Sequence, residues 1–353
     1  MQPTRHLKWV EIDLGAVRHN LKTVLRLIGP KVKLLAVVKA DAYGHGAVEI
    51  SHALLQAGAD GVGVLTLDEA EELRRAGVKG KILLMAPPPP EDAPSVAKLK
   101  LEVVVDSVKL SKALARACSS SVPVHVDVDF GLGRWGVRPK EAPELIRSIR
   151  ENRRLRLAGV SAHLDYVPGK NAVEAEEKLR IFNRIALRTK RENPEILRHC
   201  ANSTILTDFP HWKMDMVRVG NLLYGINPTS HALPLKNPWR LQARILSVQE
   251  VAKGRSIGYA SEYLAPRKMR VASLAIGYSD GLTMEPAERF IGFGKEFRYW
   301  GILKGKKAPF VGRCGISHVL IDVSKIPSAK PGDAVTLPIR RTAAGSRLPR
   351  IYI

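Results

Sequence analysis

The chain has 353 residues, of which 45% are hydrophobic and 25% are charged, and its formal net charge at pH 7 is +22. This length exceeds one ordinary core and suits a large α/β barrel with a second domain. We expect no membrane span and no signal peptide, because no apolar run reaches roughly 20 residues and the first residues lack an apolar core. Three widely spaced cysteines predict neither a disulfide framework nor a metal cluster, which favours a reducing, cytoplasmic setting.

Up to about residue 230, short apolar runs alternate with segments of helical spacing, and these patterns predict strands and helices. Strands flanked on both sides by helices indicate a parallel sheet buried on both faces. With further strands near His199 and Val217, the pattern predicts a (β/α)₈ TIM-type barrel over residues 14–235. The other predicted strands are 34–38, 61–65, 82–85, 102–105, 122–128 and 156–162, and the predicted helices are 14–27, 46–57, 67–76, 107–117, 143–152 and 172–192.

After about residue 235 the pattern of apolar residues changes. Helical spacing becomes scarce, and Gly, Pro and Ser separate short apolar runs. This pattern is typical of an all-β domain, which we place at residues 236–353. Its predicted strands are 240–251, 270–276, 308–311, 319–323 and 334–337.

A lysine at the end of the first predicted barrel strand is the sharpest candidate for chemistry. Residues 36–46 read Ala-Val-Val-Lys-Ala-Asp-Ala-Tyr-Gly-His-Gly, so Lys39 closes an apolar strand ahead of a small, flexible, polar loop. Low-dielectric walls lower the pKa of an ammonium group, and Schiff-base chemistry requires the neutral amine. Active sites of barrels lie at the C-terminal ends of strands. A surface lysine that merely ends a strand is the alternative reading.

This segment resembles the cofactor-lysine segment of alanine racemases, a family that uses pyridoxal 5′-phosphate (PLP). The resemblance covers nearly the whole chain in family order. It implies a PLP-binding barrel, a β domain that residues 1–13 join, and a homodimer in which the β domain supplies part of the partner's active site. The further matching motifs are Trp9–Leu14, Asp129–Gly136, Ser161–His163, His199–Ser203, Met216–Gly220, Leu223–Gly225, Gly258–Ala260, Ala275–Gly281 and Leu348–Tyr352.

Racemisation removes a proton from one face of Cα and returns one on the other, so it requires two acid/base groups. Lys39 is one of them, and the resemblance assigns the other role to Tyr259 of the partner subunit. A tyrosine with a pKa of about 10 is a poor base at neutral pH unless a cationic or hydrogen-bonded neighbour assists it. In the family, the residues matching His163 and Arg218 form the hydrogen-bonded series that assists this tyrosine. A strand-edge aromatic and a satisfied core histidine are the structural alternatives.

By the same resemblance, Arg218 faces the pyridine nitrogen of PLP. A guanidinium group does not give up its proton, so the ring nitrogen stays unprotonated and the cofactor is a weaker electron sink. This suits a racemase, because a long-lived carbanion favours transamination. A salt bridge within the barrel is the alternative for Arg218.

The remaining implied contacts follow the family's motifs, and the phosphate group of PLP in particular needs backbone N–H donors and hydroxyl groups. The implied cofactor contacts are Lys39, Tyr43, His163, Asn202, Ser203, Arg218, Gly220, Asn221 and Tyr352, and the implied substrate contacts are Arg134, Tyr259, Tyr278 and Ile316.

Residues 131–136 read Gly-Leu-Gly-Arg-Trp-Gly, which is formally a dinucleotide-binding pattern after a strand. We reject that reading because Arg134 and Trp135 crowd the tight turn and Pro139 falls where a helix should already run. We expect the glycines instead to free the loop so that Arg134 reaches the phenolic oxygen of the cofactor and the carboxylate of the substrate.

The chain departs from the family at three places. Many alanine racemases carry a carbamylated lysine where this chain has Asp127, and their Met-Asp pair near the substrate carboxylate is replaced by Ile316 and Ser317. The helical insert between the residues matching Leu337 and Leu348 is missing. We expect Asp127 to be a permanent carboxylate that pairs with Arg134 without carbon dioxide. A solvated aspartate at a strand end is the alternative.

Together these observations predict a cytoplasmic PLP enzyme that interconverts L- and D-alanine, and the resemblance implies that D-alanine feeds peptidoglycan synthesis. A racemase for serine or another amino acid, and a PLP-binding protein with little turnover, are the rival predictions. The net charge also raises the possibility of a nucleic-acid-binding protein. Because the basic residues are scattered and are not interleaved with aromatics, we expect a small amino-acid substrate and no nucleic-acid partner.

Overall fold

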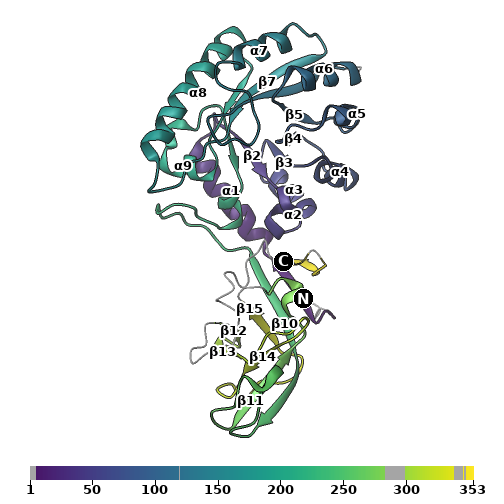
Figure 1. Ribbon diagram of the computed structural model, residues 1–353, viewed down its shortest axis with the longest axis vertical. Helices are drawn as coiled ribbons and strands as arrows, with labels where there is room; N and C mark the ends of the chain where they lie inside the picture. The colour runs from purple at the N-terminus through teal and green to yellow at the C-terminus, as the bar shows by residue number, and fades with distance from the viewer. Residues whose placement is uncertain (1–4, 119, 283–298, 338–344, 346) are drawn as a thin grey trace. The chain divides into compact units, whose positions relative to one another are not determined.

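The computed structural model describes residues 5–118, 120–282, 299–337, 345 and 347–353. The chain divides into two compact units, which Figure 1 shows by residue colour. One unit is Leu14–Asn237, and the other combines Met1–Asp13 with Pro238–Ile353.

The first unit contains eight parallel strands in the order β8-β7-β6-β5-β4-β3-β2-β9. Backbone hydrogen bonds link the two ends of this order, from Asp215 N to Arg198 O at 3.2 Å and from Arg218 N to Ala201 O at 2.9 Å. The sheet therefore closes into the expected TIM-type barrel. Its strands are β2 (Lys33–Val37), β3 (Gly61–Val64), β4 (Ile82–Leu84), β5 (Glu102–Val105), β6 (Val122–Val128), β7 (Leu155–Ala162), β8 (Leu197–His199) and β9 (Met216–Val219).

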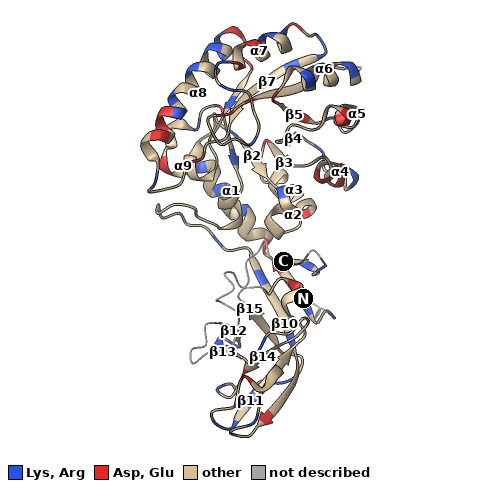
Figure 2. Cartoon of the chain, viewed as in Figure 1, with Lys and Arg blue, Asp and Glu red and all other residues tan. Residues whose placement is uncertain are grey.

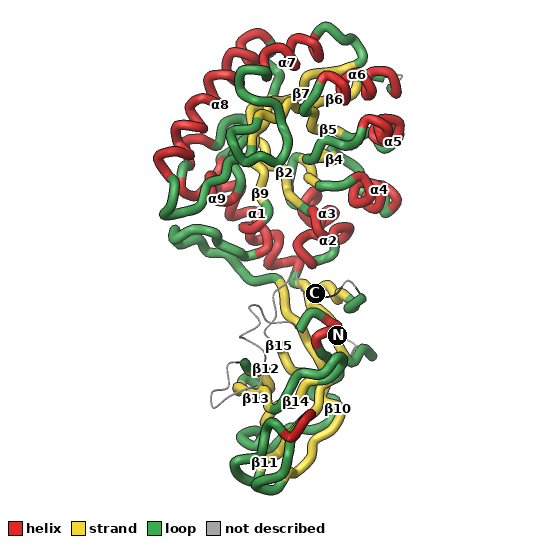
Figure 3. Tube along the Cα trace, viewed as in Figure 1, coloured by secondary structure: helices red, strands yellow, loops and turns green. Residues whose placement is uncertain are grey.

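Helices surround these strands, as Figure 3 shows. Apolar residues three and four apart give each long helix one buried face, as in α1, where Val17, Leu21 and Val24 are buried. Between the strands, side chains from β2, β4, β5 and β9 pack together to fill the barrel. The main helices are α1 (Leu14–Ile28), α3 (Ala47–Gln56), α4 (Leu67–Arg75), α5 (Ala93–Lys98), α6 (Val108–Ala117), α7 (Ala142–Arg150), α8 (Ala172–Glu192) and α9 (Ser203–Asp208).

A left-handed turn, α2 (Lys39–Gly44), follows β2 directly. Residues 40–43 have φ between 51° and 58°, a conformation that costs L-residues roughly 1–2 kcal/mol each. Two carboxylates hold it in place, since Glu69 accepts a hydrogen bond from Ala40 N at 2.6 Å and Asp41 accepts one from Ala47 N at 2.8 Å. Where the sequence predicts a loop after Lys39, the structure has a hydrogen-bonded left-handed turn.

The second unit is a β domain, as predicted. Its strands pair antiparallel, except that β1 and β16 run parallel to each other. The long strand β10 pairs with β1, β11 and β15, so the order β10-β11-β14-β13-β12-β15 returns to β10. Its strands are β1 (Lys8–Ile12), β10 (Trp239–Val251), β11 (Met269–Leu274), β12 (Trp300–Leu303), β13 (Lys306–Val311), β14 (Val319–Asp322), β15 (Ala334–Leu337) and β16 (Arg350–Tyr352).

Lysines and arginines are spread along the outer helices of the first unit, with acidic residues among them (Figure 2). On α8, Lys178 pairs with Glu174 at 2.6 Å and Arg180 pairs with Glu176 at 3.2 Å. Part of the basic excess is thus matched locally by pairs one helical turn apart. Within the described part of the chain, no helix has the length and apolarity to span a membrane.

Candidate active site

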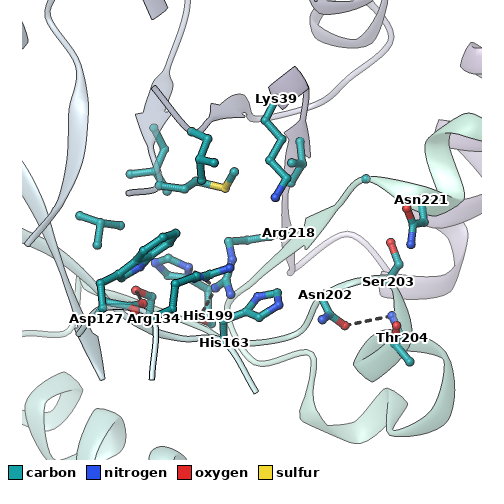
Figure 4. Close-up of a pocket in the computed structure, with 18 of the residues that line it drawn as sticks. Lys39, Asp127, Arg134, His163, His199, Asn202, Ser203, Thr204, Arg218 and Asn221 are labelled. Carbon is teal, nitrogen blue, oxygen red and sulfur yellow. Dashed lines mark hydrogen bonds between the residues drawn. The ribbon is translucent and has the colours of Figure 1, made fainter. Parts of the chain in front are cut away.

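A cavity of about 250 Å³ lies at the carboxyl ends of the barrel strands (Figure 4). It collects side chains from β2, β6, β7, β8 and β9 and from the segments that follow them, as parallel strands of a barrel direct their C-terminal residues to one end. The structure brings ten of the predicted site residues together here: Lys39, Tyr43, Asp127, Arg134, His163, Asn202, Ser203, Arg218, Gly220 and Asn221.

Lys39 extends into this cavity from the start of the left-handed turn (Figure 4). Burial lowers the pKa of its ammonium group, and the positive charge of Arg134 lowers it further, while Glu69 acts in the opposite direction. The environment therefore shifts Lys39 toward the neutral amine, which is the nucleophilic form.

Arg218 lies on β9 and is buried. Its guanidinium donates hydrogen bonds to His199 Nδ1 at 2.8 Å, to the His199 carbonyl and to the Ala162 carbonyl at 2.7 Å. Because arginine has five N–H donors, two of them have no acceptor among the described residues. The described residues also include no salt-bridge partner for Arg218, so the barrel salt bridge considered as an alternative is not found. A ligand atom that accepts a hydrogen bond would complete this group.

His163 follows β7 and is neutral in this setting. Burial, together with the positive charges of Arg218, Arg134 and Lys39, lowers its pKa to about 3. An imidazole surrounded by cations offers a hydrogen bond and no positive charge at neutral pH. It can therefore assist a tyrosine only as a hydrogen-bond partner.

Asp127 is buried in the cavity wall, and its carboxylate accepts a hydrogen bond from Ser161 Oγ. Burial raises the pKa of Asp127, and the Ser161 hydrogen bond and the charge of Arg218 partly offset that rise. No direct hydrogen bond or salt bridge joins Asp127 and Arg134 among the described residues, although their charges interact, and the Arg134 guanidinium lies 3.7 Å from the Trp135 ring centroid. The reason is register: Ser161 on β7 stands opposite Asp127 on β6, and the aspartate side chain is short.

One end of the cavity is lined by hydroxyl and amide groups from Tyr43, Ser203, Thr204 and Asn221. Burial raises the pKa of Tyr43, which keeps its hydroxyl protonated. A side chain at Gly220 would place its Cβ 2.5 Å from Tyr43 Oη, so only glycine permits this approach. This end offers the donors that an anionic ligand group requires.

Three predicted substrate contacts lie in the second unit. Tyr259, Tyr278 and Ile316 expose 55%, 49% and 57% of their surfaces, respectively. Their loops adjoin, because Tyr278 N donates to Gly315 O at 3.1 Å and the Tyr259 ring lies 5.6 Å from the His318 ring. Exposed aromatic and aliphatic side chains therefore gather on adjoining loops of this unit, in a cluster that we call the exposed triad (Tyr259, Tyr278 and Ile316).

Sequence reasoning placed no site role on several residues that line the cavity. His199 ends β8 in the same way that His163 follows β7, so the strand-end criterion could have found it. Ser161 lies inside a motif that was noted for its histidine alone. The other lining residues without a predicted role are Val37, Leu65, Leu83, Met85, Val104, Trp135 and Thr204.

Two further predictions fall elsewhere in the chain. Tyr352 is on β16, in the second unit. The missing helical insert between Leu337 and Leu348 concerns residues that lie mostly outside the described ones. Among the described residues no group of three or more His, Cys, Asp or Glu side chains is arranged to hold a metal ion.

Comparison with known families gives two matches that together span most of the chain. The model of "Alanine racemase, N-terminal domain" matches residues 12–228, and that of "Alanine racemase, C-terminal domain" matches residues 239–346. An alanine racemase of Nostoc sp. is 33% identical over 93% of this chain and 86% of its own length. An alanine racemase of Desulfovibrio desulfuricans is 33% identical over 98% of both chains.

Solved structures agree with these matches. The alanine racemase of Bacillus anthracis with bound L-Ala-P has a TM-score of 0.85 at 29% identity, over 99% of this chain and 96% of that one. The alanine racemase of Bartonella henselae, solved with covalently bound pyridoxal phosphate, has a TM-score of 0.83 at 26% identity, over 99% and 100% of the two chains.

Proposed function

Since the chain belongs to the alanine racemase family, we propose that it interconverts L- and D-alanine with PLP carried on Lys39. The observation that carries this proposal is the pairing, in one cavity, of a lysine shifted toward its neutral form with a buried arginine that has unused donors. The name of the Bartonella henselae structure, with its covalently bound pyridoxal phosphate, supports the same cofactor.

The cavity residues suit three groups of PLP: its carbonyl carbon, its pyridine nitrogen and its phosphate. Lys39 supplies the amine for the cofactor's carbonyl carbon, and Arg218 supplies donors for the pyridine nitrogen. The hydroxyls of Tyr43 and Ser203, beside the glycine at position 220, suit the phosphate group. When bound, PLP supplies an electron sink that stabilises negative charge at the substrate Cα.

The protein's own groups divide the proton transfer between two faces of the substrate. Lys39 Nζ holds or accepts the proton on one face, and Tyr259 Oη of the partner subunit does so on the other. Arg134 lines the cavity and holds the substrate carboxylate. Arg218 keeps its proton and thereby leaves the pyridine nitrogen unprotonated, which limits side reactions.

The proposed enzyme is a homodimer whose sites are shared between subunits. The exposure of the exposed triad supports this assembly, because a catalytic tyrosine and two substrate contacts presented outward are suited to reach a second copy. We further propose that the dimer works in the cytoplasm and that its D-alanine feeds peptidoglycan synthesis, as membership of the family supports.

Borohydride reduction of the purified protein, followed by peptide mapping, tests the cofactor assignment. The label should be on Lys39, and Lys39→Ala should yield no labelled peptide. A label on another lysine would end the assignment.

The same preparation, incubated with α-deuterated L-alanine and L-serine, should exchange deuterium from alanine faster. Labelled protein without exchange would indicate a PLP carrier, and faster exchange from serine would indicate a serine racemase.

A further inference from the structure

A line of buried polar side chains runs from Arg218 away from the cavity. Arg218 donates to His199 Nδ1 at 2.8 Å, His199 Nε2 lies 2.9 Å from His125 Nδ1, and His125 Nε2 lies 3.1 Å from Glu102 Oε2. We call these four residues the buried polar chain. It crosses the barrel from β9 through β8 and β6 to the first residue of β5.

The donors and acceptors of this chain have one consistent arrangement. Arginine only donates, so His199 Nδ1 is an acceptor and the proton of His199 is on Nε2. That proton is donated to His125 Nδ1, which leaves the His125 proton on Nε2, facing the Glu102 carboxylate. Both imidazoles are then neutral and share the Nε2–H tautomer. For His199, burial and the charge of Arg218 lower the pKa well below its usual value, which agrees with the neutral form.

A glycine on the intervening strand makes this crossing possible. His125 on β6 and His199 on β8 are separated by β7, where Gly159 stands opposite His125 in the parallel register. A Cβ at Gly159 would lie 2.4 Å from His125 Nδ1, the atom that accepts from His199. The two imidazoles therefore meet across β7 only because β7 has no side chain there.

Glu102 anchors the far end as an ionised acceptor. Burial alone would raise its pKa, but its interactions with His125 and the positive charges of Lys81 and Arg156 hold the pKa below its usual value. Lys81 Nζ lies 3.8 Å from Glu102 Oε1, whereas His125 contacts the other carboxylate oxygen, Oε2. Neither Glu102 nor His125 lines the cavity.

We propose that Glu102 and His125 are positioning residues for Arg218. They fix His199 in the tautomer that presents a lone pair to the guanidinium, and this sets the direction in which the two remaining N–H donors of Arg218 face the cavity. The inference rests on the proposed function, because it concerns how Arg218 is oriented toward the pyridine nitrogen of PLP.

Histidine ¹⁵N chemical shifts in the purified holoenzyme test the arrangement directly, since they distinguish the two neutral tautomers and the cation. His125 and His199, assigned with His125→Gln and His199→Gln, should both have the proton on Nε2 and none on Nδ1. A protonated Nδ1 on His199, or a charged imidazole at either position, overturns the proposal. A failed Lys39 label with these tautomers intact would instead contradict the proposed function.

Variants of Glu102 test whether the far end acts on Arg218. In Glu102→Ala, His125 loses the acceptor of its Nε2 proton, so the Nε2–H tautomer of His125 should become less populated. PLP should be lost faster on dialysis, and kcat should fall on the order of tenfold, as for other groups that orient a contacting residue. Glu102→Gln keeps an acceptor oxygen and should restore the wild-type tautomer, PLP retention and kcat.

Lys81→Ala is the matched control, because it removes the ion pair of Glu102 but leaves the hydrogen bond to His125. It should resemble wild type in tautomers, PLP retention and kcat. If Glu102→Ala folds with wild-type tautomers and wild-type PLP retention, or if Lys81→Ala is equally impaired, Glu102 has no positioning role. Gly159→Ala offers a second route, since its Cβ should separate the imidazoles and reproduce the Glu102→Ala effects with Glu102 intact.

Discussion

The barrel cavity and the exposed triad differ in how their polar groups are held. In the cavity, Arg218, Asp127 and Asn202 each have protein hydrogen-bond partners, and the side chains of Asp127 and Arg218 are buried. In the second unit, Tyr259, Tyr278 and Ile316 are each about half exposed. The difference teaches that one chain holds the proposed cofactor cavity in place, whereas Tyr259, the proposed second proton-transfer group, is presented outward. Experiments that affect the two regions differently test this division.

The largest effect is expected from Tyr259→Phe, which removes only a hydroxyl from the exposed triad. If Tyr259 transfers a proton, turnover should fall by the roughly 10²- to 10⁴-fold typical of a general acid/base, with PLP still bound. Loss of α-deuterium should slow more for one alanine enantiomer than for the other. Tyr263→Phe, at a partly buried position that packs against the core cluster of the same unit, is the control and should retain activity. Equal and mild slowing of both enantiomers would mean that Tyr259 only packs.

A smaller effect is expected from the pH dependence of folding, which reports on the cavity. His163 has a pKa of about 3 in the folded protein, against about 6.5 when unfolded. The unfolded chain therefore binds one more proton between these values. The contribution of neutral His163 to the free energy of unfolding is fully present above pH 6.5. It is lost as the pH falls, at up to about 1.4 kcal/mol per pH unit. The free energy of unfolding, measured with urea at pH 4.5, 5.5 and 7, should fall less steeply with decreasing pH in His163→Gln than in wild type. An equal pH dependence in the two proteins would contradict the lowered pKa of His163.

The smallest effect is expected at Asp127, which lines the cavity. Loss of the hydrogen bond with Ser161 in Asp127→Ala should lower turnover about fivefold, in line with one net hydrogen bond, while PLP stays bound. Asp127→Asn keeps an acceptor for Ser161 and should lose less. Removal of bicarbonate should leave wild-type activity unchanged, because no carbamate is needed. Full activity in Asp127→Ala would show that this carboxylate has no part in the site.

The barrel was predictable because its strands are continuous apolar runs separated by amphipathic helices, and Lys39 ends one of those runs. The partner of Asp127 was not predictable, since strand register, and not sequence spacing, sets Ser161 opposite it. The meeting of His125 and His199 depends on a glycine in a third strand. Contacts among separate strands follow from the closed barrel, which no local pattern encodes.

The left-handed turn after Lys39 also limits how far the segment can be transplanted. Within residues 36–46, the left-handed turn at residues 40–43 is held partly by Glu69, which accepts from Ala40 N. The second carboxylate oxygen of Glu69 caps the start of α4 by accepting from Leu65 N and Thr66 N. A graft of the eleven-residue segment onto another barrel would leave that carboxylate behind. The grafted residues would then be free to relax toward the ordinary right-handed form, which would redirect the lysine. The portable element for enzyme design is therefore the segment together with the beginning of the next βα unit.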